Sequence, residues 1–561
     1  MAVMAPYETI FFSMSSNRRN GRGVKKQMRK ITMLSLLLFA AITGKAFAYD
    51  VQLKPFQDVG PTDWFYDNVY SLAALGMING ESAAIFHPDG LLSREAFVKL
   101  IVAASREETQ QSSASSLPDV PADRWSYPYI AYAAERHWIN FMLDASGQFH
   151  PAQPITREEV AALIGKMLLE SLDEPSRSQW LQSGWIGEKE ANPFKDSRPI
   201  AEAIAPYVYY AVHQGILEGD ERGFRPGDLL PRKEAAAIIY RCVDLAATGQ
   251  ALDVTGFYAI RSYPAIGRIS SLSNVIFGWS HLQYDKAGQA SLQTEATEYR
   301  IPDGWEQAVE AAKAANIHSE LMVYSGGASL RDFVKDKAAQ AAFIDSLLQT
   351  LDDPQYPFTG VCIDFEGLKE EAGAADYVAF LSALKAKLGH RSLTVAVPPV
   401  YYYKGYDLKK IGDIADTVIL MAYDFTDQGG KLPSAPLPLV NDTVRQALVA
   451  IPKEKLVLGI SKQANQWITS QGGTSYYEPE IDAVERRLAA QPEGQSWSLP
   501  YHLKQITFQD ERGSHLIYYE DAESIAKKLW LAQYYGLKGV SIWHMGNATA
   551  SDWDAIHAAA K

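Results

Sequence analysis

Residues 358–367 read Phe358-Thr359-Gly360-Val361-Cys362-Ile363-Asp364-Phe365-Glu366-Gly367, an apolar run that ends in two carboxylates. Side chains alternate between the two faces of a β-strand, so Asp364, Glu366 and Cys362 point to the same face. Two neighbouring carboxylates away from water cannot both ionise easily, and one is expected to keep its proton to a higher pH. A protonated acid beside an ionised one is typical of a site that cleaves glycosidic bonds. The alternative is an acidic pair at a strand end that contributes to a turn or a surface ion pair.

This run is one of eight β-rich runs that alternate with helical stretches from about Asp253 onward. The runs are Val254–Tyr263, Asn274–Ser280, Ser319–Tyr324, Gly360–Glu366, Leu393–Pro398, Thr417–Asp424, Leu456–Ser461 and Gly539–His544. The pattern predicts an α/β fold, a (β/α)8 TIM barrel over residues 253–561. A doubly wound open sheet is the competing fold, but it calls for a glycine-rich phosphate loop after an early strand, and the sequence contains none.

Polar and aromatic residues gather at the predicted strand ends, where catalytic groups of such barrels lie. Each alone has a simpler explanation, core packing for an aromatic ring or capping for an Asp, but their joint placement favours a functional site. The residues are Tyr258, Tyr263, Trp279, Ser280, Tyr324, Asp364, Glu366, Tyr423, Asp424, Gln463 and Trp543.

The first half of the chain contains three similar units. Each has an F-x-D or P-D landmark, a later F-x-P and a helix start with arginine, and the arginines Arg94, Arg157 and Arg232 are spaced 63 and 75 residues apart. Ser93 and Thr156 are N-cap types with acids in the following turn, so each unit is predicted to be all-α, helix, loop, helix. A guanidinium beside a helix N-terminus suits an anion. The alternative is three helical units that only pack together, although packing alone should have no use for the recurring cation.

Composition is that of a soluble globular protein, with 47% hydrophobic and 21% charged residues. The net charge of -13 argues against nucleic acid as a partner. Between Lys25 and Ile42 a basic stretch is followed by an apolar run, and the small-x-small sequence Ala46-Phe47-Ala48 comes after it. This pattern predicts a signal peptide over residues 1–48. The alternative is an N-terminal anchor that is retained. Cys242 and Cys362 fall in different predicted domains, so no disulfide is expected. No cofactor and no metal site are predicted.

The repeats resemble S-layer homology domains, through F-x-D, G-x-x-x-G, F-x-P and T-R-x-E landmarks over nearly all of residues 49–245. The predicted repeats are 49–106, 117–170 and 192–245, with a Ser- and Gln-rich linker at Glu107–Ser116. The resemblance implies anchoring to a pyruvylated secondary cell-wall polymer through Arg94, Arg157 and Arg232, and Trp64 and Trp125 are candidate contacts to the same polymer. The third repeat departs from the pattern, because Pro231 replaces Thr and the early Trp is missing.

The C-terminal half resembles glycoside hydrolase family 18. The motifs are Gly360-Val361-Cys362-Ile363-Asp364-Phe365-Glu366, Met421-Ala422-Tyr423-Asp424 and Gly539-Val540-Ser541-Ile542-Trp543. Tyr518-Tyr519-Glu520-Asp521-Ala522 and Tyr535-Gly536-Leu537-Lys538-Gly539 look most like the spore cortex-fragment-lytic branch, which cleaves peptidoglycan sugar chains, whereas other relatives cleave chitin.

The resemblance implies substrate-assisted retention, an exception to the two-carboxylate scheme. Glu366 would be the acid and then the base, Asp364 would hold the substrate acetamido N–H, and Tyr423 would donate to the acetamido oxygen. Trp543 and Asp424 would line the same subsite, and Trp279, Tyr258, Tyr324 and Gln463 are further candidate substrate contacts. The family motif D-x-x-D-x-D-x-E has two further Asp residues, and in this sequence Thr359 replaces the first and Cys362 the middle one. Asp364 therefore lacks the charged neighbour that the middle Asp would provide. We expect the pKa of Glu366 to be set by burial and by Asp364, and the activity to have an acidic-to-neutral pH optimum.

The sequence therefore predicts a secreted hydrolase of an N-acetylated polysaccharide, of the peptidoglycan or chitin type, on a Gram-positive-type wall or S-layer, with no membrane contact after signal cleavage. Two alternatives stay open: a catalytically weak, chitinase-like glycan-binding protein, and a chiefly structural S-layer component.

Overall fold

The computed structural model describes residues 54–560 except 83, 107–116, 197–199, 260, 286–287, 400–402, 491 and 500. The predicted signal peptide and the linker at Glu107–Ser116 lie outside these residues. Among the described helices, none has the length and apolar character that crossing a membrane requires. Cys242 and Cys362 are both buried and free.

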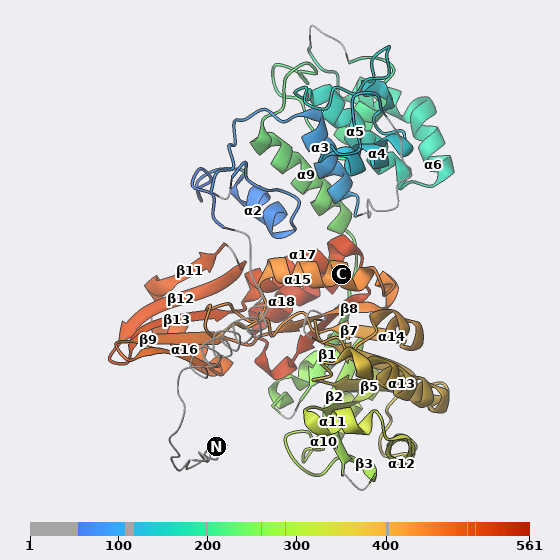
Figure 1. Ribbon diagram of the computed structural model, residues 1–561, viewed down its shortest axis with the longest axis vertical. Coiled ribbons are helices and arrows are strands. Elements are labelled where there is room, and N and C mark those ends of the chain that lie inside the picture. Colours follow the sequence, from blue (N-terminus) through green and yellow to red (C-terminus); the bar gives the residue numbers. More distant parts are fainter. Residues whose placement is uncertain are drawn as a thin grey trace, which may run out of the picture. The chain divides into compact units, whose positions relative to one another are not determined.

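The N-terminal repeats are three helix pairs, as the sequence predicts (Figure 1). The pairs are α2 (Tyr66–Ala74) with α3 (Arg94–Ala104), α4 (Tyr127–Glu135) with α5 (Arg157–Glu170), and α8 (Ala205–His213) with α9 (Arg232–Ala247). Ser93 and Thr156 cap α3 and α5, and Thr156 forms a capping box with Glu159. Two further helices, α6 (Glu174–Gln179) and α7 (Trp185–Ala191), precede α8 and account for the longer spacing to the third repeat.

In each repeat, an aspartate holds the loop that precedes the second helix. Its two carboxylate oxygens accept from consecutive backbone N–H groups, a charge-assisted contact that suits a loop without a strand partner. The pairs are Asp58 with Phe86 and His87, Asp119 with Phe149 and His150, and Asp196 with Phe224 and Arg225. The F-x-D and F-x-P landmarks are therefore two halves of one contact.

The three repeat arginines close the repeats into a ring. Arg94 donates to the carbonyl of Phe149 at 2.8 Å, Arg157 to that of Phe224 at 3.0 Å, and Arg232 to that of Phe86 at 2.7 Å. Each guanidinium thus serves the next repeat, and the third serves the first. The premise that packing alone has no use for a cation here is wrong, because loop carbonyls need a donor that the backbone does not supply.

Replacing Arg157 by Met should lower the free energy of unfolding of the helical repeats by about 1–3 kcal/mol. Its side chain is buried and bonds the carbonyls of Phe224 and Glu218 in the third repeat, which Met would leave without a donor. The shift is measured as the denaturant midpoint of the far-ultraviolet helix signal. Arg222, whose exposed side chain bonds the nearby Asp220, is the control, and its change to Met should shift the midpoint little. Equal shifts for both variants would contradict the ring.

Eight parallel strands form a closed barrel, which confirms the predicted fold. They are β1 (Asp253–Tyr258), β2 (Asn274–Tyr284), β4 (His318–Ser325), β5 (Gly360–Phe365), β6 (Ser392–Val397), β7 (Thr417–Leu420), β8 (Leu456–Ser461) and β14 (Gly539–Trp543). Their order is β1-β14-β8-β7-β6-β5-β4-β2, and the pairing of β1 with β2 closes the ring. The short β3 (Ala290–Gln293) pairs antiparallel with the end of β2. Every residue of β5 is buried, as expected of a barrel strand covered on both faces.

Helices follow the barrel strands, and Figure 1 shows them outside the sheet. They are α10 (Trp305–Ala314), α11 (Ala328–Phe333), α12 (Lys337–Leu351), α13 (Ala374–Leu388), α14 (Leu408–Ile414), α15 (Leu437–Leu448), α17 (Ala522–Tyr535) and α18 (Ala550–Ala560). The longer ones bury an apolar stripe, such as Phe343, Ile344 and Leu347 of α12.

A small five-stranded antiparallel sheet is inserted between β8 and β14, and the sequence analysis missed it. It comprises β9 (Asn465–Ser470), β10 (Gly473–Tyr477), β11 (Gln495–Ser498), β12 (Leu503–Asp510) and β13 (Gly513–Tyr519), with helix α16 (Ile481–Ala490). Its own core contains Val484, Ile506 and Ile517. The signal that could have found it is the turn at Asp510–Gly513 between two alternating runs.

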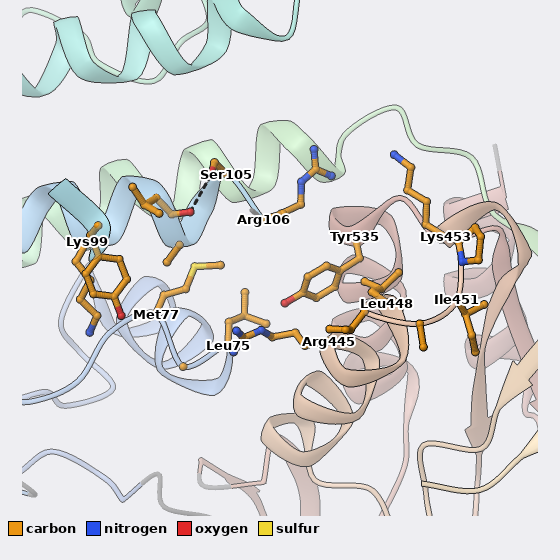
Figure 2. Close-up of a pocket in the computed structure, with 17 residues that line it drawn as sticks. Leu75, Met77, Lys99, Ser105, Arg106, Arg445, Leu448, Ile451, Lys453 and Tyr535 are labelled. Carbon is orange, nitrogen blue, oxygen red and sulfur yellow. Dashed lines mark hydrogen bonds between the residues drawn. The ribbon is translucent and has the colours of Figure 1, made fainter. Parts of the chain in front are cut away.

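A further cavity has a volume of about 710 Å³. Figure 2 shows the residues that line it. It is lined by residues that follow α2, such as Met77, by residues of α3 and by residues in and after α15, such as Arg445 and Ile451. The Asn441 amide of α15 donates to the carbonyl of Leu75 nearby. No predicted catalytic residue lines this cavity.

Candidate active site

Asp364 and Glu366 lie at the C-terminal end of β5, as the sequence predicts. Asp364 pairs in register with Tyr324 of β4, and the Glu366 backbone N–H continues the ladder by donating to the carbonyl of Ser325 at 2.7 Å. Asp364 is only 4% exposed, whereas Glu366 is half-buried. Gly367, with φ of 92°, turns the chain away directly after them, a conformation that glycine adopts without strain.

Burial raises the pKa of both carboxyls. The pKa of Asp364 lies well above its ordinary value, first because burial disfavours the charged form and then because Glu366 is close. Burial, followed by the charge of Asp424, raises the pKa of Glu366 to about 7. Among the described residues Asp364 Oδ1 has no hydrogen-bond partner, so an oxygen of this buried acid is free for a ligand. The pair can hold and transfer a proton near neutral pH.

Tyr423 and Asp424 follow β7, which ends at Leu420, earlier than the predicted strand. Tyr423 is buried, and burial followed by the charge of Asp364 raises the pKa of its hydroxyl, which keeps it a proton donor. Its ring lies against Gly459 of β8, where a Cβ would come within 3.1 Å of the ring. The backbone of Asp424 has a φ of 63°, and its N–H donates to Ser434 Oγ at 3.0 Å. Burial, followed by the charge of Glu478, raises the pKa of the Asp424 carboxyl to about 6.

Two cavities border this group. One, of about 520 Å³, is lined by Tyr423, Asp424, Gln463, Glu478 and Trp543, among others, so that three predicted substrate contacts meet there. The other, of about 460 Å³, is lined by Glu366 and by the predicted contact Tyr324. The predicted site residues are therefore divided between two cavities, with Tyr423, Asp424, Gln463 and Trp543 in one and Tyr324 and Glu366 in the other.

Two of the predicted substrate contacts are buried instead. Trp279 has an exposed fraction of 0%, and its ring packs on Phe277 with centroids 4.3 Å apart. Tyr258 is also buried and meets the Trp279 ring edge-on. Because β2 runs on to Tyr284, Trp279 lies mid-strand in the core and not at a strand end. Trp279 and Tyr258 therefore lie in the barrel core and line neither of the two cavities.

Cys362 has an acidic neighbour that the sequence analysis missed. Burial raises the pKa of the Cys362 thiol well above its usual value, and the next contributors are Glu320 and Asp364. Glu320 of β4 is buried, and its Oε1 accepts from Ser392 Oγ at 2.6 Å and Thr394 Oγ1 at 2.9 Å. Cys362 thus behaves as a small apolar filler between two acids, and a carboxyl from the neighbouring strand lies beside it.

Further residues around Glu366 come from helix α11 and from loops, and the sequence pattern did not predict them. Tyr403, Lys369 and Arg331 line the cavity beside Glu366. Glu478 reaches Asp424 from the inserted sheet, and its Oε1 accepts from the Tyr476 hydroxyl at 2.8 Å. Such groups carry no strand periodicity, so only a three-dimensional arrangement identifies them.

On the helical repeats, Trp64 and Trp125 are 61% and 54% exposed, unusually high for Trp. Arg94 and Arg157 are buried by their contacts to the next repeat, and Arg232 is partly covered by the Phe86 ring. The two Trp side chains therefore face solvent, whereas the arginines lie between repeats. Within the described residues no group of three or more His, Cys, Asp or Glu side chains could hold a metal ion.

Both halves of the chain match the patterns of known protein families. The pattern of Glycosyl hydrolases family 18 matches residues 253–548, and that of the S-layer homology domain matches 55–98, 116–161 and 193–236. A cortical fragment-lytic enzyme of Bacillus anthracis is 26% identical over 39% of this chain and 53% of its own length, and that of Bacillus subtilis is 26% identical over 40% and 54%. The chain thus spans about half the length of these relatives.

Among solved structures, the spore cortex-lytic enzyme SleL of Bacillus cereus superposes with a TM-score of 0.48 at 20% identity, over 55% of this chain and 74% of that chain. The family pattern covers more than half of the present sequence, from the first barrel strand to beyond the last. The chain belongs to glycosyl hydrolases family 18 and carries three S-layer homology repeats ahead of its barrel.

Proposed function

We propose that the protein is a glycosidase that cleaves β-linked N-acetylglucosamine-containing glycan with retention, assisted by the substrate acetamido group, while the repeats hold it on the cell wall. The observation that carries this is the buried Asp364 beside Glu366, with Tyr423 near both. A neutral Glu366 can protonate the leaving oxygen, and the free oxygen of Asp364 suits an acetamido N–H.

The roles follow from the positions. Glu366 gives its proton to the glycosidic oxygen and later takes one from water. Asp364 orients the acetamido group so that its carbonyl oxygen attacks the anomeric carbon, and Tyr423 donates to that oxygen. This closes an oxazolinium ring on the sugar and expels the leaving sugar, and water then opens the ring. Trp543 offers a ring face, and Asp424 and Gln463 polar groups, in the cavity that would hold this sugar.

Turnover is the test that separates a hydrolase from a glycan-binding protein on the same scaffold. Incubation with N-acetylglucosamine oligomers and with peptidoglycan, followed by mass spectrometry of the products, should give shorter N-acetylated fragments. Oligomers that are retarded on the protein but returned unchanged would favour the binding protein.

Changing Asp424 to Asn should move the alkaline limb of the pH profile to lower pH. Glu366 acts as an acid only while protonated, so activity is present below its pKa of about 7 and lost as pH rises through it. The negative charge of Asp424 raises this pKa, and removing the charge lowers it. The measurement is kcat/KM of an N-acetylglucosamine oligomer between pH 4 and 9. Asp427→Asn, a change of an acid nearby in sequence that does not line the cavity, is the control, and a limb that stays in place for Asp424→Asn would contradict the assignment.

Anchoring is proposed to use Trp64 and Trp125, toward a pyruvylated wall polymer at the cell surface. Exposed aromatic faces suit sugars, whereas the guanidiniums of Arg94, Arg157 and Arg232 already donate to loop carbonyls between the repeats. Trp64→Ala together with Trp125→Ala should lower sedimentation with purified Gram-positive walls at least about threefold, since each loses a large contact area. Trp185→Ala, a helix-surface tryptophan outside the repeat pattern, is the control. Unchanged sedimentation of the double variant would remove the tryptophans from the wall contact.

A further inference from the structure

We propose that Arg331 and Lys369 form a carboxylate-binding subsite for the leaving sugar, so that an acidic N-acetylated glycan is a better substrate than a neutral chitin-type chain. The proposal rests on the proposed function, because it assigns the two sides of the cleavage point. Both residues line the cavity of about 460 Å³ that Glu366 borders.

The side of the site follows from which residues line which cavity. Tyr423, Asp424 and Trp543 line the cavity proposed for the sugar whose acetamido group reacts. Glu366 lines the other cavity, and the two have no lining residue in common. Because Glu366 protonates the oxygen between the two sugars, the second cavity receives the leaving sugar.

Within the part of the chain that the structure describes, no carboxylate forms an ion pair with either cation of this second cavity. Arg331 lies in the last turn of α11 and Lys369 four residues beyond the end of β5, and both side chains are exposed. Among the described residues neither forms an ion pair or a side-chain hydrogen bond, and the Lys369 ammonium lies 5.9 Å from the centre of the Tyr403 ring. Other cations of the barrel do form ion pairs, such as Lys462 with Asp552 and Arg261 with Glu480.

The chemistry selects an anion on the ligand. The chain carries a net charge of -13, so two unpaired cations beside the acid Glu366 are a local reversal of sign. A guanidinium binds a carboxylate through two parallel hydrogen bonds, and an ammonium adds a point charge. Glu366 and Glu370 also line the cavity, so Arg331, Lys369 and Glu370 together leave about one net positive charge while Glu366 is protonated.

Two kinds of glycan substituent present a carboxylate to such a site: a lactyl ether on the sugar itself, and a peptide attached to that ether. A chain of N-acetylglucosamine alone presents neither. The shared chemistry is a carboxylate within reach of the leaving sugar, and the substrates in the experiment distinguish the two sources.

The experiment compares kcat/KM for four substrates of equal sugar length. They are an N-acetylglucosamine oligomer, a peptidoglycan oligosaccharide with free lactyl carboxylates, the same oligosaccharide with those carboxylates amidated, and one with its stem peptides intact. The variants are Arg331→Gln, Lys369→Gln and both together. Lys335→Gln, an exposed lysine just after α11 that does not line the cavity, is the matched control.

We expect the ratio of kcat/KM for the free-carboxylate substrate over the neutral oligomer to fall about threefold in each single variant and about tenfold in the double variant. Amidation should lower the wild-type ratio by a similar factor, and the control should keep the wild-type ratio. A drop seen only with intact stem peptides assigns the carboxylate to the peptide. A ratio that stays constant across the variants, or equal losses on neutral and acidic chains, would overturn the subsite.

Binding keeps this test independent of turnover. Calorimetry is done with the Glu366→Gln protein and the same four ligands, with and without the added substitutions Arg331→Gln and Lys369→Gln. The order of the affinities should match the order of the kcat/KM values. Failure of the proposed function appears as absence of hydrolysis on every substrate by the wild-type protein. Failure of the subsite appears as equal affinity for the amidated and free-carboxylate ligands.

Discussion

Replacing Glu366 by Gln is expected to lower kcat on N-acetylglucosamine oligomers by about 10²- to 10⁴-fold. Gln has nearly the same shape but has no proton to give to the leaving oxygen and cannot later accept one from water. The loss should depend on the leaving group, because a dinitrophenyl glycoside leaves without protonation. Its first step should therefore be nearly as fast in the variant as in the wild-type protein, seen as a burst of dinitrophenol.

Glu370→Gln is the matched control, since Glu370 lines the same cavity and is exposed. We expect it to change kcat by less than about threefold. Thermal unfolding and wall sedimentation of Glu366→Gln should match the wild-type protein, because the side chain makes none of the repeat contacts. Near-normal turnover of natural oligomers by Glu366→Gln would remove it from the acid role.

Replacing Asp364 by Asn is expected to cost about 10²-fold in kcat, because the acetamido group loses the carboxyl that orients it and that can ionise to balance the positive ring. Dinitrophenyl glycosides should not recover the burst, since the attack itself is slowed. Glu366→Gln, in contrast, is expected to keep the burst with these glycosides. Substrates whose amino groups carry no acetyl should already be poor for the wild-type protein, and Asp364→Asn should slow them little further.

Cys362→Ser is the control for a change at a buried position on the same strand face. Cys362 is buried between Glu320 and Asp364, so the substitution changes the local packing without touching substrate. We expect a modest loss of stability and kcat within about tenfold of wild type. A burst with Asp364→Asn equal to that of Glu366→Gln would show that the two acids do not divide the work as proposed.

The sequence predicts the barrel well because its strands are buried on both faces and are separated by helices of ordinary length. The eight runs match the eight strands, with differences mainly at their ends, such as Thr417–Asp424 against β7 at Thr417–Leu420. Asp364, Glu366, Tyr423 and Asp424 come together for the same reason, since strand order in a barrel brings strand ends to one rim.

The remaining features depend on three-dimensional packing that periodicity does not encode. Trp279 has the same local pattern as a strand-end aromatic, but the extension of β2 to Tyr284 places it in the core. The inserted sheet follows β8 without a composition change. The repeat arginines resemble free anion binders in sequence, and only the ring arrangement reveals that each donates to a loop of another repeat.

The most direct test of the central claim is the anomeric configuration of the first product. Proton NMR within the first minutes of N-acetylglucosamine oligomer hydrolysis should show the β-anomer first, followed by slow mutarotation. Retention is required if the acetamido group of the substrate is the nucleophile held by Asp364 and Tyr423 and Glu366 is the single acid and base. Appearance of the α-anomer first, or no hydrolysis at all, would contradict the account.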